Sequence, residues 1–197
     1  MWMSSAYEQT GRVNQKQRTR QALIDAARDL LARGTTPSVE QAAANASVSR
    51  PTAYRYFPNQ EALLFAAHPA LGVESLLPEH PSEDPLERLE AVSRALVQSL
   101  LDHETALRAM LRISLEQSAE RPPLALRTGR RIRWVEDALA PLRSRLEPER
   151  FHDLVIRIAA TLGIEPLIWL IDIAHVERTQ AAAMLCASAR DILKAAL

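Results

Sequence analysis

Apolar residues recur at helical spacing along almost the whole chain, and this feature constrains the fold most strongly. Ala, Leu, Arg and Glu, which recur in these segments, are among the strongest helix formers. No segment shows the strict alternation of apolar and polar residues that a half-buried strand requires, and the 197 residues include only five glycines. The sequence therefore predicts an all-α fold.

Prolines and a few glycines divide this helical pattern into segments. Gly34 stands where a helix C-cap is expected, and the prolines from Pro78 to Pro85 predict a loop. Gly163 and Pro166 predict a bend inside the longest apolar segment. We expect helices over residues 16–33, 39–45, 50–56, 60–76, 86–101, 104–119, 124–145, 149–173 and 178–195.

Two short helices joined by a tight turn are predicted between residues 38 and 57. Ser38 and Gln41 have the spacing of a capping box, which starts the first of them. Ser49 can cap the second, where Pro51 occupies the first turn and loses no helical hydrogen bond. With the helix at 16–33 to brace them, the pair forms a helix-turn-helix arrangement.

The second short helix carries side chains suited to the major groove of DNA. Its inward positions are Ala53 and Phe57, which leaves Arg50, Tyr54 and Arg55 facing outward. Arginine can donate two hydrogen bonds to guanine, and a tyrosine hydroxyl can reach a phosphate oxygen. A solvated polar face is the plain alternative for these residues alone, but the capped turn before them favours DNA binding.

The segments Arg20 to Ala27, Val48 to Phe57 and Pro58 to Leu64 carry an arginine-containing first helix, a Val-Ser turn, Tyr-x-x-Phe and Pro-x-x-Glu-x-Leu. In these features residues 18–67 resemble the N-terminal domain of TetR-family transcriptional regulators. The resemblance implies core positions at Val39, Ala43, Val48 and Phe57, and base or phosphate contacts from Ser49, Arg50, Pro51, Thr52, Tyr54, Arg55 and Tyr56. Arg20 and Gln60 are added as candidate phosphate contacts.

Two departures from the family pattern concern the turn and the next helix. Ser47 stands where the family usually has glycine, and a positive φ there would cost a serine on the order of 1 kcal/mol. Gln60 stands where a lysine commonly contacts phosphate, so it can donate a hydrogen bond without releasing a counterion. Neither departure removes the motif.

Charge divides the chain although its formal net charge is zero. Residues 1–68 hold 8 Lys and Arg against 5 Asp and Glu, a balance of +3, which leaves 16 against 19 for residues 69–197. A basic N-terminal part suits nucleic acid. We expect a flexible arm at 1–15, a three-helix helix-turn-helix DNA-binding domain at 16–67, and a larger helical domain for ligand sensing and dimerisation at 68–197.

Large or polar residues on otherwise apolar helices are candidates for a ligand pocket in the larger domain, although each is individually more typical of a packed core. Arg112 would favour an anionic ligand and Glu165 a basic one, so the ligand's charge stays open. The run Arg127, Arg130, Arg131 and Arg133 is scattered around a helix and is interpreted as solvated surface. The candidate ligand-binding residues are His103, Met110, Arg112, Trp134, Glu165 and Trp169.

A homodimer is expected because one short recognition helix contacts too few base pairs, and two-fold dimers on palindromic sites remedy this. The segment 149–173 carries more apolar residues than one buried face needs, and 178–195 offers a stripe of small side chains. A wholly internal helix pair is the alternative. The expected interface residues are Leu154, Ile158, Leu162, Trp169, Ala182, Cys186 and Ala189.

The sequence indicates a cytoplasmic, sequence-specific regulator of transcription, and we expect a repressor that a small molecule releases from double-stranded DNA. A regulator that responds to a protein partner is the alternative. No glycine-rich phosphate loop, metal-binding His-x-x-x-His pair or acid–base dyad is found, so we expect no enzyme activity, cofactor or metal. No apolar segment free of charges is long enough to predict a membrane span.

Overall fold

A computed structural model describes residues 4–67, 73–115 and 129–197, with side chains from residue 13 onward. Throughout these residues the secondary structure is helical without strands, which confirms the predicted all-α fold. The chain separates into two compact units. Unit 1 comprises Met1–Leu71 and Thr105–Leu126, and unit 2 comprises Gly72–Glu104 and Arg127–Leu197.

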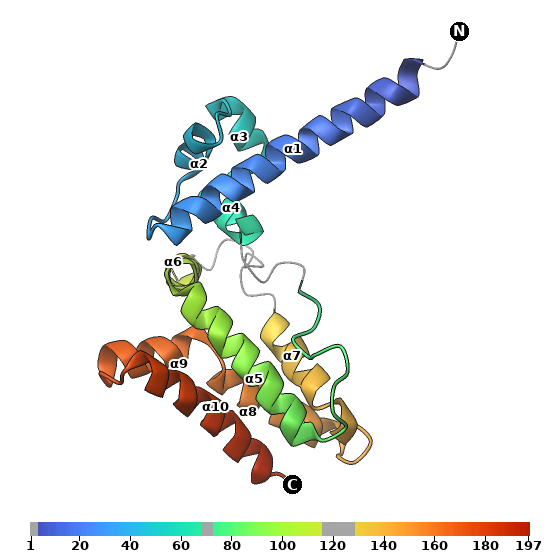
Figure 1. Ribbon diagram of the computed structural model, residues 1–197, viewed down its shortest axis with the longest axis vertical. Helices are drawn as coiled ribbons and strands as arrows, with labels where there is room; N and C mark the ends of the chain where they lie inside the picture. Colours follow the sequence, from blue (N-terminus) through green and yellow to red (C-terminus); the bar gives the residue numbers. More distant parts are fainter. Residues whose placement is uncertain (1–3, 68–72, 116–128) are drawn as a thin grey trace. The chain divides into compact units, whose positions relative to one another are not determined.

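Unit 1 contains the expected helix-turn-helix arrangement (Figure 1). Helices α2 (Val39–Asn45), α3 (Arg50–Tyr56) and α4 (Gln60–Ala67) pack along α1 (Ser4–Ala32). The bounds of α2 and α3 are those predicted from the sequence. Leu23, Ala27, Val39, Ala43, Ala53, Phe57, Leu63 and Leu64 form the core, which Ala106, Met110 and Ile113 of α6 (Glu104–Leu115) join.

Two helix bounds in unit 1 differ from the prediction. Helix α1 begins at Ser4, so most of the expected flexible arm at 1–15 is helical. The helix expected over 60–76 ends as α4 at Ala67, residues 68–72 lie outside the described residues, and residues 73–76 are not helical. Pro69, which lacks an amide donor, and Gly72, which has low helix propensity, disfavour the longer helix.

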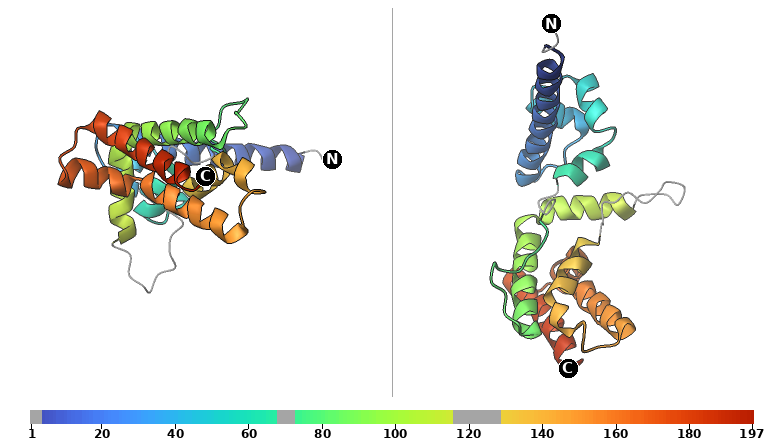
Figure 2. Two further views of the ribbon diagram at one scale, coloured as in Figure 1. Left: turned by 90° about the horizontal axis from the view of Figure 1, so that it is seen from below. Right: turned by 90° about the vertical axis from the view of Figure 1, so that its right-hand side faces the viewer.

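Unit 2 is built around α5 (Pro85–Asp102) and α10 (Arg178–Lys194), which lie alongside each other (Figure 2). Helix α8 (Pro148–Thr161) packs against α10, and α7 (Arg130–Ala138) packs against both α5 and α8. Residues 73–84 precede α5 without helix, which confirms the loop predicted from the prolines between Pro78 and Pro85. The core includes Leu89, Val92, Leu96, Val135, Leu139, Leu142, Leu154, Ile158, Leu162, Leu167, Leu185 and Leu193.

A buried arginine caps the end of α7. Arg88 of α5 is 9% exposed, and its Nε donates to the carbonyl of Ala138 at 2.9 Å. Its Nη2 donates to the carbonyl of Asp137 at 2.7 Å, and Nη1 reaches the carbonyl of Ser82 at 3.2 Å. The bonds to Ala138 and Asp137 satisfy carbonyls that the end of α7 leaves without intrahelical partners. The α-helix expected to run to residue 145 therefore ends at Ala138, and Pro141 follows within a 3-10 turn.

The apolar segment 149–173 is interrupted, as its glycine predicted. Helix α8 ends at Thr161, Gly163 is extended with φ −147° and ψ 172°, and α9 (Ile164–Ile168) starts a new helix. Pro166 falls in the first turn of α9, where a missing amide donor costs little, so Gly163 and not Pro166 marks the break. A π-helical turn over Trp169–Ile173 completes the segment.

Among the described residues, Pro148–Ile173 is the one segment long and apolar enough to cross a membrane by length and composition. Half of its most apolar window is buried inside the protein. Because the helix is also broken at Gly163, this segment is weak evidence for a membrane span and has the character of a core segment.

Candidate nucleic-acid interface

Helix caps position the helix-turn-helix elements as the sequence predicted. Gly34 ends α1 with a positive φ of 81°, the left-handed conformation that glycine adopts without steric cost. The Ser38 hydroxyl accepts from the Gln41 amide at 3.2 Å, and the Gln41 side chain accepts from the Ser38 amide at 2.8 Å. The predicted capping box is therefore confirmed, and it sets where α2 begins.

The turn between α2 and α3 has the hydrogen bonds of a Schellman motif. The Val48 amide donates to the Ala43 carbonyl at 2.9 Å, and the Ser47 amide donates to the Ala44 carbonyl at 3.2 Å. Ser47 lies in the left-handed region with φ 55°. The positive φ suspected from the family pattern is thus present, and a serine occupies a position that favours glycine.

Helix α3 begins at a serine cap. The Thr52 amide donates to the Ser49 hydroxyl at 3.4 Å, and the Ser49 and Thr52 hydroxyls lie 2.8 Å apart. Pro51 is in the first turn, and Phe57 ends the helix. These caps leave α3 two turns long, with Ala53 fully buried beneath it.

The predicted DNA contacts divide into exposed and partly buried side chains. Gln60 donates to the carbonyl of Pro37 at 2.9 Å, and Tyr56 packs partly against the core of unit 1. The Arg20 guanidinium lies 5.5 Å from the centre of the buried Phe57 ring, which holds it near the end of α3. The exposed contacts are Arg20, Ser49, Arg50, Pro51, Tyr54 and Arg55, and the partly buried ones are Thr52, Tyr56 and Gln60.

A carboxylate that the sequence analysis missed joins two of these contacts. The Tyr54 hydroxyl donates to Glu40 Oε1 at 2.5 Å, and Arg50 Nη2 pairs with the same oxygen at 2.9 Å. The Arg50 guanidinium also lies 5.7 Å from the centre of the Tyr54 ring. We call these three residues the Glu40 cluster. Because Glu40 precedes Tyr54 by fourteen residues, no local pattern could reveal the contact.

The cluster shifts two pKa values in opposite directions. The hydrogen bond from Tyr54, followed by bonds from the backbone and Ser38, lowers the pKa of the Glu40 carboxyl. The same bond to Glu40, followed by desolvation, raises the pKa of the Tyr54 phenol. At neutral pH the cluster therefore holds a charged carboxylate and a protonated phenol.

The six predicted ligand-binding residues are divided between the two units. Met110 lies in the core of unit 1, and Arg112 is exposed on the same helix. In unit 2, Trp134 is 7% exposed and donates to the carbonyl of Val73 at 3.3 Å, as a packed core tryptophan does. The His103 ring lies 3.0 Å from the carbonyl of Ser99, and Trp169 is exposed. Glu165, the sixth, pairs with an arginine of α7.

That arginine, Arg131, corrects the interpretation of the arginine run as solvated surface. Its Nη1 donates to the Leu162 carbonyl at 3.1 Å and to Glu165 Oε2 at 3.2 Å, at the break between α8 and α9. Burial and the nearby Arg133 lower the pKa of Arg130. Arg133 is exposed as expected, and Arg127 lies outside the described residues.

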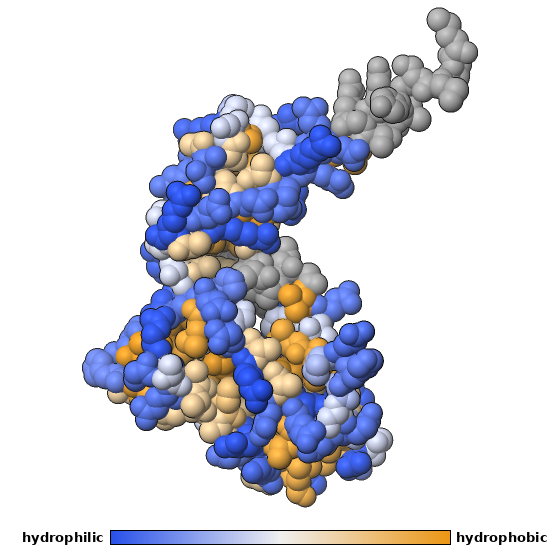
Figure 3. All heavy atoms as spheres, viewed as in Figure 1, coloured by the Kyte–Doolittle hydropathy of each residue, from blue (hydrophilic) through white to orange (hydrophobic). Residues whose placement is uncertain are grey.

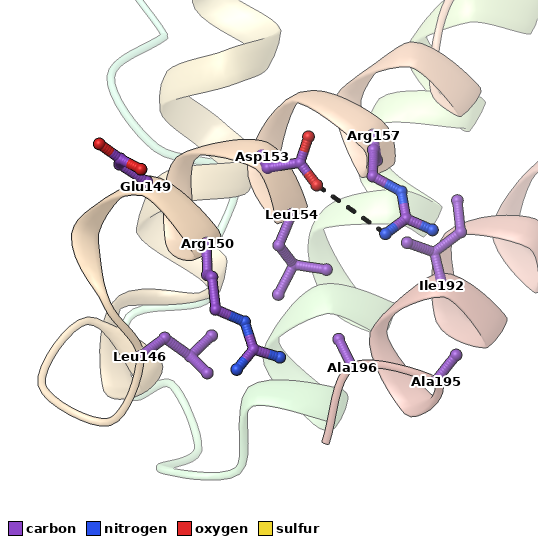
Figure 4. Close-up of a pocket in the computed structure, with 9 residues that line it drawn as sticks. All are labelled: Leu146, Glu149, Arg150, Asp153, Leu154, Arg157, Ile192, Ala195 and Ala196. Atoms are coloured by element: carbon purple, nitrogen blue, oxygen red, sulfur yellow. Dashed lines mark ion pairs between the residues drawn. The ribbon is translucent and has the colours of Figure 1, made fainter.

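A surface pocket of about 400 Å³ lies between the N-terminal part of α8 and the C-terminal end of α10 (Figure 4). Its apolar lining includes Leu154 and Ile192, and its charged lining includes Arg150 and the ion pair of Arg157 with Asp153 at 3.9 Å. None of the six predicted ligand-binding residues lines this pocket. Among the described residues no group of three His, Cys, Asp or Glu side chains is placed to hold a metal ion.

The residues predicted for the dimer interface differ in how deeply they are buried within one chain. Leu154, Ile158, Leu162 and Ala189 are at most 3% exposed within one chain, which favours the internal alternative, and their place in a dimer interface stays a prediction. Helices α8 and α10, which carry three of these residues, pack against each other inside unit 2. Trp169 is 58% exposed, and Ala182 and Cys186 are partly exposed. Ile173 and Met184, which the prediction omitted, are also exposed.

Comparison with known proteins supports the helix-turn-helix assignment. Residues 23–67 match the family model described as bacterial regulatory proteins, tetR family, which confirms the resemblance expected from the sequence. A crystal structure of a HlyIIR mutant protein is similar at 13% identity, with a TM-score of 0.44, over 87% of this chain and 95% of that chain. The comparison with curated proteins gives no match.

Proposed function

We propose a mode of action for this chain, which carries a DNA-binding domain of the TetR family over residues 23–67 and is therefore a DNA-binding transcriptional regulator. It acts in the cytoplasm as a homodimeric repressor and binds a palindromic site through two copies of α3. A small molecule bound by unit 2 releases it from DNA. The proposed DNA binding rests on one observation: α3, which follows a capped turn, exposes several hydrogen-bond donors.

The geometry of α3 supports insertion into the major groove. Arg50, Tyr54 and Arg55 are exposed, while Ala53 and Phe57 on the opposite side are buried in the core of unit 1. A rigid inner face holds the helix, so the outer side chains can meet base edges and phosphates in a fixed register.

Binding to duplex DNA tests this assignment directly. The full-length protein should enrich a palindromic sequence from a random duplex library, and its affinity should fall steeply as salt rises. The Arg50→Ala, Tyr54→Ala, Arg55→Ala variant should lose that binding because the helix keeps its core but loses its donors. The matched control is Arg33→Ala with Arg145→Ala, which removes the same positive charge from other exposed positions. A folded α3 variant that bound normally would refute the assignment.

Coupling between ligand and DNA binding passes through α6 in our proposal. The helix starts at Glu104, a buried residue of unit 2 that forms an ion pair with Arg178 of α10. Its Met110 belongs to the core of unit 1. Because Glu104 and Met110 lie on the same helix, a ligand that changes the surroundings of Glu104 acts on a helix that contributes to the core of unit 1.

A thermal-shift screen of metabolites and hydrophobic drugs tests for the small molecule. A ligand at about 100 times its dissociation constant adds about 2.7 kcal/mol of stability, which is readily measured. We expect a stabilising compound to weaken DNA binding, because a population shift requires the ligand to favour the non-binding state. A stabilising ligand that left DNA affinity unchanged would contradict the coupling, and a response to a protein instead would favour the partner-sensing alternative.

A further inference from the structure

We propose that Glu40 is an internal competitor for DNA, whose carboxylate holds the donors of Tyr54 and Arg50 that a DNA phosphate would otherwise take. The inference rests on the proposed function of α3 and adds a residue on α2 that limits its affinity. No feature of the sequence alone assigns this role to Glu40.

The hydrogen bonding of Tyr54 makes the competition unavoidable at that residue. A phenol has one proton to donate, and in the free protein the Tyr54 hydroxyl donates it to Glu40 Oε1 at 2.5 Å. A phosphate oxygen can only accept, so it must displace Glu40 before Tyr54 can donate to it. Binding of Tyr54 to phosphate therefore exchanges one anionic acceptor for another. It contributes less binding free energy than a hydroxyl without a partner in the free protein would.

The charge of Arg50 is affected in the same way. Its Nη2 pairs with Glu40 at 2.9 Å, while the side chain remains 70% exposed and keeps other N–H groups for DNA. A guanidinium paired with a carboxylate adds less net positive charge at the interface. The Glu40 carboxylate, 37% exposed itself, also stands where an approaching phosphate would be repelled.

The competition has a signature in the salt dependence of binding. Each phosphate neutralised on duplex DNA contributes about −0.9 to the slope of log affinity against log salt concentration. Releasing Arg50 should make the slope more negative by up to about 0.9 for each recognition helix bound. Between about 200 and 50 mM salt, this change corresponds to an additional gain of roughly threefold in affinity per helix.

The experiment compares full-length wild type with E40Q, E40A and D29N on the same random-sequence duplex. Asp29 is exposed on α1, so D29N makes the same charge change outside the Glu40 cluster. We expect E40Q and E40A to bind more tightly than D29N and with a steeper salt dependence. Adding Y54F should reduce the gain of E40A, because part of that gain depends on the released hydroxyl, whereas the amide oxygen of E40Q can still accept from Tyr54.

A titration of the tyrosines without DNA checks the cluster separately. The phenol absorbance of E40A should show one tyrosine with a pKa lowered toward its ordinary value, and the signal missing in Y54F identifies it as Tyr54. Unchanged titration in E40A, or E40Q and E40A affinities no higher than that of D29N, would overturn the inference while leaving DNA binding intact. If wild type bound no duplex DNA, the proposed function would fail, and the inference with it.

Discussion

Ser47 carries an unfavourable backbone conformation in the turn that sets the angle between α2 and α3. Its φ of 55° lies in the left-handed region, and its amide takes part in the bonds that close α2. The turn is therefore stabilised by the surrounding hydrogen bonds and by the packing of Val48 against the core, despite the residue at its centre.

Replacing Ser47 with glycine should stabilise the protein by up to about 1 kcal/mol, because glycine has no Cβ to clash in the left-handed region. Chemical denaturation measures the change. Ala46→Gly is the matched control, since Ala46 is right-handed with φ −84° and should lose stability through the greater flexibility of glycine. Equal effects of the two glycines would argue against strain at Ser47.

Arg88 is a buried charged residue that donates to several carbonyls. Its removal would leave these carbonyls without a hydrogen-bond donor. Arg88→Met should destabilise the protein by on the order of 3 kcal/mol, since the carbonyls of Ala138, Asp137 and Ser82 lose their donor. The exposed Arg94 of the same helix supplies the control, because Arg94→Met should change stability little. A small loss at Arg88 would mean that water replaces its hydrogen bonds.

At the scale of elements, the break between α8 and α9 depends on a glycine and an arginine together. A Cβ at Gly163 would lie 1.5 Å from Arg131 Nη1 and 2.4 Å from Glu165 Oε2. The φ of Gly163 is extended and open to any residue, so the space that Arg131 occupies, and not backbone strain, accounts for the glycine.

Gly163→Ala should therefore act by displacing Arg131 from the Leu162 carbonyl and from Glu165, at a cost of about 1 kcal/mol, because both side chains are flexible and partly exposed. Arg131→Met removes the same bonds. The double variant should be little worse than either single one, because both changes break one interaction. Additive losses in the free energy of unfolding would show that the glycine and the arginine act independently.

At the scale of the whole molecule, hydrophobic side chains reach the surface of unit 2 (Figure 3). Trp169 and Ile173 of the π-helical turn are 58% and 64% exposed, and Met184 of α10 is 42% exposed. Contiguous apolar patches at a surface mark sites where proteins associate. In our proposal a second copy of the chain covers them.

Trp169→Glu with Ile173→Glu should therefore convert the dimer to a monomer without unfolding unit 2, and operator binding should weaken with it. Sedimentation at micromolar concentration measures the mass, and circular dichroism checks the fold. Ala189→Glu is a contrasting variant: Ala189 is fully buried, so a charge there should unfold the protein and not merely separate two copies. A wild-type monomer, or a double variant that stays dimeric, would contradict this interface.

Local signals in the sequence determined the helix-turn-helix elements. The caps at Ser38 and Ser49 and the glycine at position 34 act on neighbouring amides and carbonyls, so spacing alone located α2, α3 and the end of α1. Apolar periodicity likewise determined the all-helical class, because a helix must bury one face whatever it packs against.

Only the tertiary structure decided which partner each face and each charge would have. Periodicity could not distinguish an internal face from a dimer face, and only the structure shows that Leu154, Ile158 and Ala189 are buried within one chain. The same limit applies to Arg131, whose hydrogen-bond partners are more than thirty residues away in the sequence. Glu40 meets Tyr54 because two short helices pack together, and contacts between separate helices depend on three-dimensional packing that sequence spacing does not encode.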